Sequence, residues 1–154
     1  MASNNPNANA QTFVAEVEIV TIVDQLLDIW NGASTGTLAS LLADNYRGHM
    51  LHLPDGERDA TEYAAWIRAY RELNPNVTFE IIEQFSAADR VVSRLRATRG
   101  SLGSGLQTTH GINISRLDGD GRIAEEWALW SAWSTQADLR ERASTAEIET
   151  SRSD

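Results

Sequence analysis

The chain has 154 residues, a hydrophobic fraction of 42% and a net charge of −9, so it is the size of one ordinary domain with a sizeable core. The acidic balance disfavours nucleic acid and anionic membrane surfaces as partners, because no basic cluster is concentrated enough to neutralise a row of phosphates. The absence of cysteine rules out disulfides, thiol catalysis and thiolate metal sites.

The chain ends differ from its middle. Residues 1–11 are polar and rich in Asn and Ala, without the basic start or apolar centre of a signal peptide. We expect a disordered lead at 1–11, one domain at 12–137 and a polar tail at 138–154. No apolar run approaches the roughly 18 residues that a membrane span requires. A cytoplasmic protein is therefore expected.

The first half has the pattern of helices. Apolar residues recur at helical spacing from Thr12 to Asn31, and Gly32 is a suitable stop. Thr37 can cap a short helix over Leu38–Ala43. Asp59 and Glu62 stand in the relation of a capping box, which predicts a third helix that ends near Asn74-Pro75. Between the last two helices, Tyr46–Leu53 is expected to be extended.

The second half has the pattern of strands. β-Branched and aromatic residues fill four runs separated by turn-like breaks: Val77–Phe85, Val91–Arg99, Gln107–Leu117 and Arg122–Trp133. Short turns between consecutive strands predict an antiparallel meander. Helices followed by strands predict an α+β fold, in which N-terminal helices pack on a curved antiparallel sheet and enclose an apolar pocket.

The segment Gly111–Trp127 resembles the last two strands of the SnoaL-like polyketide cyclases, in the NTF2-like superfamily. The matching residues are Arg116, Gly121, Arg122, Ile123, Glu125 and Trp127. Leu41–His49 is similar to the family segment that often carries a histidine, and the resemblance covers about residues 17–134. It implies an NTF2-like cone without a cofactor, a small apolar substrate and a homodimer. It does not select a reaction, because this superfamily includes cyclases, isomerases, dehydratases, epoxide hydrolases and non-catalytic binders.

One position departs from the family. The aldol cyclases carry a catalytic Asp four residues after the Trp of the last strand, and this chain has Ser131 there. A serine cannot exchange a proton near neutral pH without a neighbouring base. The resemblance therefore implies the pocket but not the usual mechanism.

Strand alternation suggests a replacement for that Asp. In a regular last strand, one face carries Glu125, Trp127, Leu129, Ser131 and Trp133. The resemblance would turn this face to the pocket, where burial would raise the pKa of Glu125 and fit it for acid/base work. The structural alternative pairs Glu125 with an arginine, namely Arg94, Arg96 or Arg116. The opposite face, with Ala124, Glu126, Ala128, Trp130 and Ala132, suits a dimer contact.

The three histidines of the chain are candidates for proton transfer. His49 matches the family histidine, His110 opens a strand and could face either way, and His52 is expected in a loop at the pocket rim. Their spacing does not predict a metal site. Tyr46 and Trp66 are expected to reach the pocket and contact substrate, although packing would explain either of them.

We therefore expect a cofactor-free cyclase or isomerase of secondary-metabolite biosynthesis, acting on an apolar polyketide- or terpenoid-like intermediate. His49, Glu125 and His110 are its expected catalytic residues, while Trp127, Leu129, Ser131 and Trp133 would join Tyr46 and Trp66 in binding substrate. Two alternatives stay open: a non-catalytic ligand-binding module, and a hydrolase or dehydratase that uses Glu125.

Overall fold

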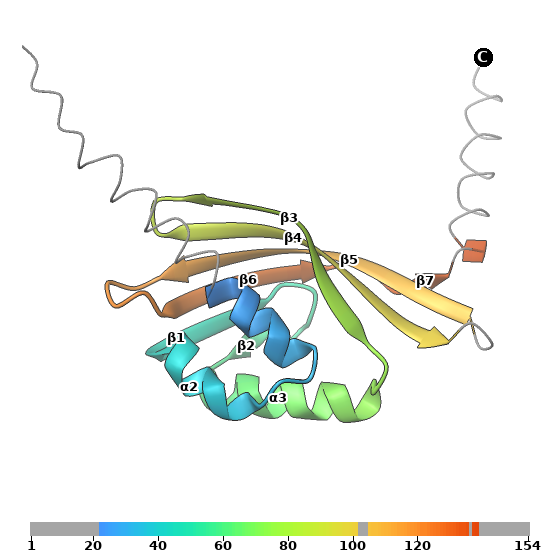
Figure 1. Cartoon of the computed structure of the whole chain (residues 1–154), viewed down its shortest axis with the longest axis horizontal. Helices are drawn as coiled ribbons and strands as arrows, with labels where there is room; N and C mark the ends of the chain where they lie inside the picture. The colour runs from blue at the N-terminus through green and yellow to red at the C-terminus, as the bar shows by residue number, and fades with distance from the viewer. Residues whose placement is uncertain (1–21, 102–104, 136, 139–154) are drawn as a thin grey trace, which may run out of the picture.

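Helices pack against the concave face of a curved sheet (Figure 1). The computed structural model describes residues 22–101, 105–135 and 137–138. Residues 22–30 are helical and are followed by the 3-10 turn η1 (Thr35–Thr37), α2 (Leu38–Leu41) and, later, α3 (Ala60–Leu73). The strands are β1 (Leu42–Met50), β2 (Glu57–Arg58), β3 (Thr78–Ala87), β4 (Arg90–Ser101), β5 (Gly105–Leu117), β6 (Ile123–Trp130) and β7 (Ser134–Thr135). The α+β fold expected from the sequence is confirmed.

The described strands form one seven-stranded sheet in the order β2-β1-β6-β5-β4-β3, with β7 paired to β5. The antiparallel meander of β3 to β6 is as predicted. The sequence did not indicate that β1 runs parallel to β6, since this pairing joins segments far apart in the chain. The predicted extended segment Tyr46–Leu53 begins four residues earlier, at Leu42, where the chain leaves α2 and enters the sheet directly.

The last long strand is shorter than predicted. β6 ends at Trp130 and not at Trp133, and the backbone N–H of Ser131 then donates to the carbonyl of His110 at 2.9 Å. The chain continues into the short strand β7 beside the start of β5. This exit places residues 131–133 at the end of the sheet, next to the site described below.

The capping box at the start of α3 is confirmed. Glu62 N–H donates to Asp59 Oδ1, and Asp59 N–H donates to Glu62 Oε2, both at 2.9 Å. Thr37 is the N-cap residue of α2 as expected, but its side chain makes no capping hydrogen bond. A 3-10 turn precedes α2, and Ser34 caps that turn by accepting from Gly36 N–H at 3.2 Å. The start of the first helix, the lead at 1–11 and nearly all of the tail at 138–154 lie outside the described residues.

The core fills the space between the helices and the concave face. Tyr46, Tyr63 and Ile67 are each about 1% exposed and pack with residues of the first helix, α2 and β6. Tyr46 contacts Tyr63 with ring centroids 5.3 Å apart. Within the described part of the chain, no helix is both long and apolar enough to cross a membrane.

Candidate active site

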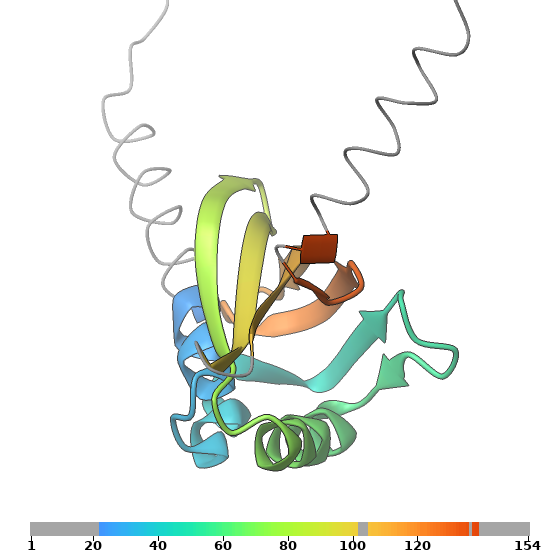
Figure 2. The same ribbon diagram turned by 90° about the vertical axis from the view of Figure 1, so that its right-hand side faces the viewer.

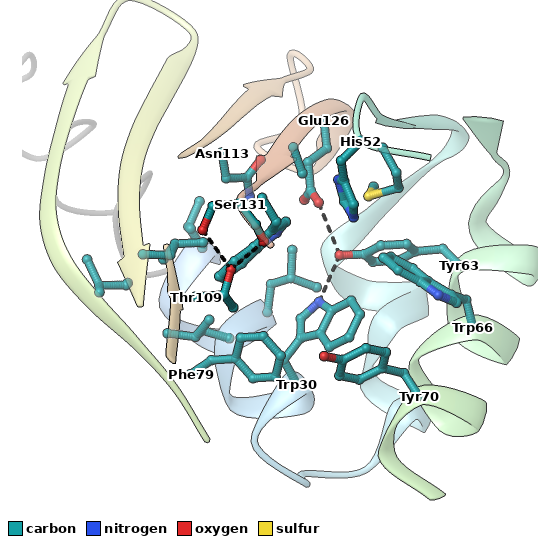
Figure 3. Close-up of a pocket in the computed structure, with 18 of the residues that line it drawn as sticks. Trp30, His52, Tyr63, Trp66, Tyr70, Phe79, Thr109, Asn113, Glu126 and Ser131 are labelled. Carbon is teal, nitrogen blue, oxygen red and sulfur yellow. Dashed lines mark hydrogen bonds between the residues drawn. The ribbon is translucent and has the colours of Figure 1, made fainter. Parts of the chain in front are cut away.

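A cavity of about 200 Å³ lies between the first helix, α3 and the concave face of the sheet. Most of its wall is aromatic or aliphatic (Figure 3). The aromatic members are Trp30, Tyr63, Trp66, Tyr70, Phe79, Trp130 and Trp133. The wall is polar at a few places only, which are His52, Thr109, Asn113, Glu126, Ser131 and the hydroxyls of the two tyrosines. Such a cavity suits an apolar ligand that is oriented by a small number of polar contacts.

Glu126 is the buried carboxyl group of this wall. Its residue is 3% exposed, and the hydroxyl of Tyr63 donates to its Oε1 at 3.1 Å. Trp30 Nε1–H in turn donates to the Tyr63 oxygen at 2.9 Å, which orients that hydroxyl (Figure 3). Burial raises the pKa of Glu126 to about 7, although the side chains of Tyr63 and Asn113 act in the opposite direction. The carboxyl group is therefore about half protonated at neutral pH.

Two polar atoms of the wall have no hydrogen-bond partner within the described structure: Glu126 Oε2 and Asn113 Oδ1. A buried polar atom left unpaired costs about 1–3 kcal/mol. Both belong to residues of the cavity wall, so the unpaired atoms lie beside the space that a ligand would occupy. Because its pKa is near neutrality, Glu126 can accept a proton from such a ligand or donate one to it.

Thr109 and Ser131 form a second polar patch in the cavity wall. Thr109 Oγ1 donates to the backbone carbonyl of Ser131 at 2.6 Å, and the two hydroxyl oxygens are 3.1 Å apart. The backbone N–H of His110 also donates to Ser131 Oγ, at 3.2 Å. Ser131 thus lines the cavity as expected, but these contacts hold its hydroxyl and place no base beside it.

His52 lies at the opening of the cavity, in the turn after β1, on the same side as Glu126 in Figure 3. Its residue is exposed, and the partial burial of its ring lowers the pKa of the imidazole. Trp66, Tyr70 and Trp133 also line the cavity and are half-buried. His52, Trp66 and Trp133 thus line the cavity, and a role for them in binding substrate stays a prediction.

The face of β6 that was expected to line the cavity is in fact on the outer side of the sheet, away from the helices. Glu125, Trp127 and Leu129 do not line the cavity, and Leu129 is 52% exposed. Helices cover the face that carries Glu126, Ala128 and Trp130. The expectation that this second face makes a dimer contact is wrong for the same reason.

Glu125 is paired with an arginine, which was the structural alternative to a catalytic role. Its Oε2 accepts from Arg116 Nη2 at 3.0 Å, and its Oε1 lies 3.0 Å from His49 Nε2. Hydrogen bonds from His49 and Arg116 lower the pKa of Glu125, so the expected rise is wrong. His49 also stacks on Trp127, with centroids 5.5 Å apart. The structure thus brings His49 and Glu125 together, but on the face away from the cavity.

The remaining predicted residues also lie outside the cavity wall. His110 is exposed on the outer face of β5, and Tyr46 is buried in the core beneath α3. In the described part of the chain, no group of three or more His, Asp or Glu side chains is arranged to hold a metal ion.

Sequence reasoning missed Glu126 because it turned the wrong face of β6 to the cavity, and it missed Asn113 because it assigned no faces to β5. One signal was available, since Arg116 and Glu125 are cross-strand partners on adjacent strands. An Arg–Glu pair of this kind usually lies on the solvent-facing side of a sheet. Because side chains alternate along a strand, this placement of Glu125 predicts that Glu126 points inward.

Comparison with known proteins supports the same fold. The model of the SnoaL-like polyketide cyclase family matches residues 20–139. IdmH of Streptomyces antibioticus, a polyketide cyclase candidate, is 21% identical over 73% of this chain and 91% of its own, with a TM-score of 0.64. A polyketide cyclase candidate from Bacillus cereus ATCC 10987 is 25% identical over 74% of each chain, with a TM-score of 0.63. AclR of Streptomyces galilaeus, a hydroxylase candidate, is 14% identical over 89% of this chain and 97% of its own, with a TM-score of 0.64. No curated protein matches the chain.

The family model covers well over half of the 154 residues, and the described fold agrees with it. The chain therefore belongs to the SnoaL-like polyketide cyclase family.

Proposed function

We propose that this protein is a cofactor-free cyclase or isomerase of secondary-metabolite biosynthesis, acting in the cytoplasm on an apolar polyketide- or terpenoid-like intermediate. The observation that carries the proposal is Glu126, a carboxyl group with a pKa of about 7 in the wall of an aromatic cavity. In this proposal Glu126 replaces the acid that relatives keep at the position of Ser131.

The chemistry is a proton transfer beside a carbonyl group. Glu126 Oε2 takes a proton from the carbon next to that carbonyl, while the hydroxyl of Tyr63 holds Oε1 in place. The resulting enolate attacks a second carbonyl carbon within the same substrate, whose π bond opens and whose oxygen takes the proton from Glu126, or it is reprotonated by Glu126 at another carbon. The cavity excludes water and folds the substrate, which favours ring closure over side reactions.

The hydrolase or dehydratase alternative relied on Glu125 as base. It loses its basis because Glu125 lies on the outer face and is paired with Arg116. A non-catalytic binding module would share the cavity but would not require a carboxyl group that titrates near neutrality.

The proposal can be tested with 2-tetralone, an apolar bicyclic ketone whose α-hydrogens exchange slowly with deuterium in water. The protein should accelerate this exchange, followed by NMR, with a rate that rises as pH increases through about 7, because the base is the carboxylate. Glu126→Gln should lose at least about 100-fold of the protein-dependent rate. Glu125→Gln removes the neighbouring carboxylate on the outer face and should keep it. Absence of exchange in the unaltered protein, or an unchanged rate in Glu126→Gln, would contradict the proposal.

We also propose that the protein is a homodimer formed through the outer face of the sheet. Large apolar side chains are exposed there, with Phe85 58%, Ile112 52% and Leu129 52% accessible. Ile112 and Leu129 are cross-strand partners, so they form one patch. A second copy of this patch would cover it.

A further inference from the structure

The arginines of β4 divide between the two faces of the sheet. Arg94 and Arg96 lie on the outer face and form ion pairs with Glu83 and Glu80 of β3. Arg99 is four residues after Leu95, so the two side chains lie on the same, concave face of β4. Leu95 lines the cavity. Arg99 stands near the end of β4, the strand that lies beside β3 in Figure 2.

Neutral groups hold the guanidinium of Arg99. Its Nε–H donates to Gln107 Oε1 and its Nη1–H donates to Asn74 Oδ1, both at 2.9 Å. Its Cζ lies 4.2 Å from the ring centroid of Trp133, a residue of the cavity wall. Within the described residues, no carboxylate lies within ion-pair distance of Arg99, in contrast to Arg94 and Arg96. Its Nη2 has no partner in the same part of the chain.

Among the described residues, Arg99 is therefore a preorganised cation without a counter-charge. Arg99 is half buried, and an arginine fork is well suited to a planar carboxylate. Its charge also opposes the rise that burial causes in the pKa of Tyr70, another residue of the cavity wall. A ligand that leaves the cavity beside Tyr70 and Trp133 therefore meets a positive charge, although the whole chain carries a net charge of −9.

We propose that Arg99 binds a carboxylate on the ligand whose apolar body occupies the cavity. The inference deepens the proposed function and rests on it for the fate of that ligand. The carboxylate stays at the mouth, where water still reaches it, because burying it in the aromatic cavity would be costly. The reacting carbon lies at the other end, near Glu126.

The geometry also sets the shape of the ligand. Gln107 is the cross-strand partner of Arg99, whereas Asn113 lies further along β5, on the wall shared with Glu126. Six residues of strand separate Gln107 from Asn113, which is about 20 Å along the backbone before the side chains extend toward each other. The ligand is therefore elongated, with its acid group and its reacting carbon at opposite ends.

The test compares two probes of the same shape, biphenyl-4-acetate and its neutral analogue biphenyl-4-acetamide, by isothermal titration calorimetry. The unaltered protein should bind the acid about tenfold more tightly than the amide at low salt, and added salt should reduce this preference. Arg99→Gln should abolish the preference while leaving the affinity for the amide unchanged. Arg99→Lys should restore part of it, because the charge returns without the fork.

Arg96→Gln is the matched control, since it removes a charge from the outer face of the same strand and should keep the preference. Glu126→Gln should also keep it, which separates this inference from the proposed proton transfer. The inference is overturned if the unaltered protein does not prefer the acid, or if Arg99→Gln retains the preference. Equal weakening of both probes in Arg99→Gln would also overturn it, because that result assigns Arg99 to packing of Trp133.

Discussion

Glu125 and Glu126 are neighbours on β6, and their surroundings move their pKa values in opposite directions. Burial raises the pKa of Glu126, whereas hydrogen bonds from His49 and Arg116 lower that of Glu125. The strand alternates its side chains between a covered and an open face, so adjacent identical residues occupy different environments. Only the covered carboxyl group exchanges a proton near neutral pH.

The raised pKa of Glu126 makes the stability of the protein depend on pH. Between its ordinary value of 4.5 and about 7 the folded state binds more protons than the unfolded state, so stability falls as pH rises through this window. At about 1.4 kcal/mol for each pH unit, the loss is roughly 3 kcal/mol. Urea denaturation from pH 4.5 to 8 should therefore show the unaltered protein losing about that much free energy of unfolding relative to Glu126→Gln.

Glu125→Gln should give the opposite sign when the denaturation series is extended to lower pH. The pKa of Glu125 is lowered in the fold, so this group stabilises the protein above its ordinary pKa and the contribution is lost as pH falls. The unaltered protein should thus lose stability relative to Glu125→Gln as pH falls below about 4.5, and the difference between the two should stay constant between pH 5 and 8. For Glu126, the contradicting outcome is a free energy of unfolding that depends on pH in the same way in the unaltered protein and in Glu126→Gln. That result would show that Glu126 does not titrate near neutrality.

At the scale of elements, the strands and α3 could be predicted because their signals are local. Alternating β-branched residues, turn residues between them and the capping box of Asp59 and Glu62 all lie within a few residues of each other. The inner face of β6 could not be predicted in the same way. Both of its faces carry apolar and aromatic residues, and the helices that cover one of them come from distant parts of the chain. That is why Glu125 was favoured over Glu126.

The pairing of β5 with β6 also shapes the cavity through Gly111. A Cβ at Gly111 would lie 2.5 Å from Cδ2 of Trp130, its cross-strand partner, which lines the cavity. Gly111→Ala should displace the indole and destabilise the protein by about 1–3 kcal/mol. Thermal and urea denaturation would measure the loss.

Gly119→Ala is the control for this substitution, because nothing lies within 4 Å of a Cβ placed there. It should change stability by less than about 0.5 kcal/mol. Removing the indole in the double variant Gly111→Ala/Trp130→Ala should relieve the clash, so its two effects should be less than additive. Additive losses would mean that Gly111 does not support Trp130.

At the scale of the whole molecule, the two faces of the sheet have separate uses. The concave face and the helices enclose the cavity, while the convex face leaves an apolar row open to solvent. Register places Trp127 opposite Ile114, Ile114 opposite Val92 and Val92 opposite Phe85, so the row crosses four strands. A surface of this kind is typical of an interface between protein chains.

The proposed dimer makes this row its interface, and substitution can separate it from the cavity. Leu129→Asp places a charge beside the row, opposite Ile112 on the same outer face, and in a symmetric interface the change is present in both copies. Sedimentation velocity should show the unaltered protein as a dimer and Leu129→Asp as a monomer.

Leu73→Asp is the matched control, because Leu73 is 82% exposed at the end of α3, far from the row in sequence and on the helical layer. It should leave the dimer intact. A monomeric unaltered protein, or equal dissociation in both variants, would rule out the outer face as the interface. Because Leu129 does not line the cavity, the monomer should still bind biphenyl-4-acetamide with unchanged affinity.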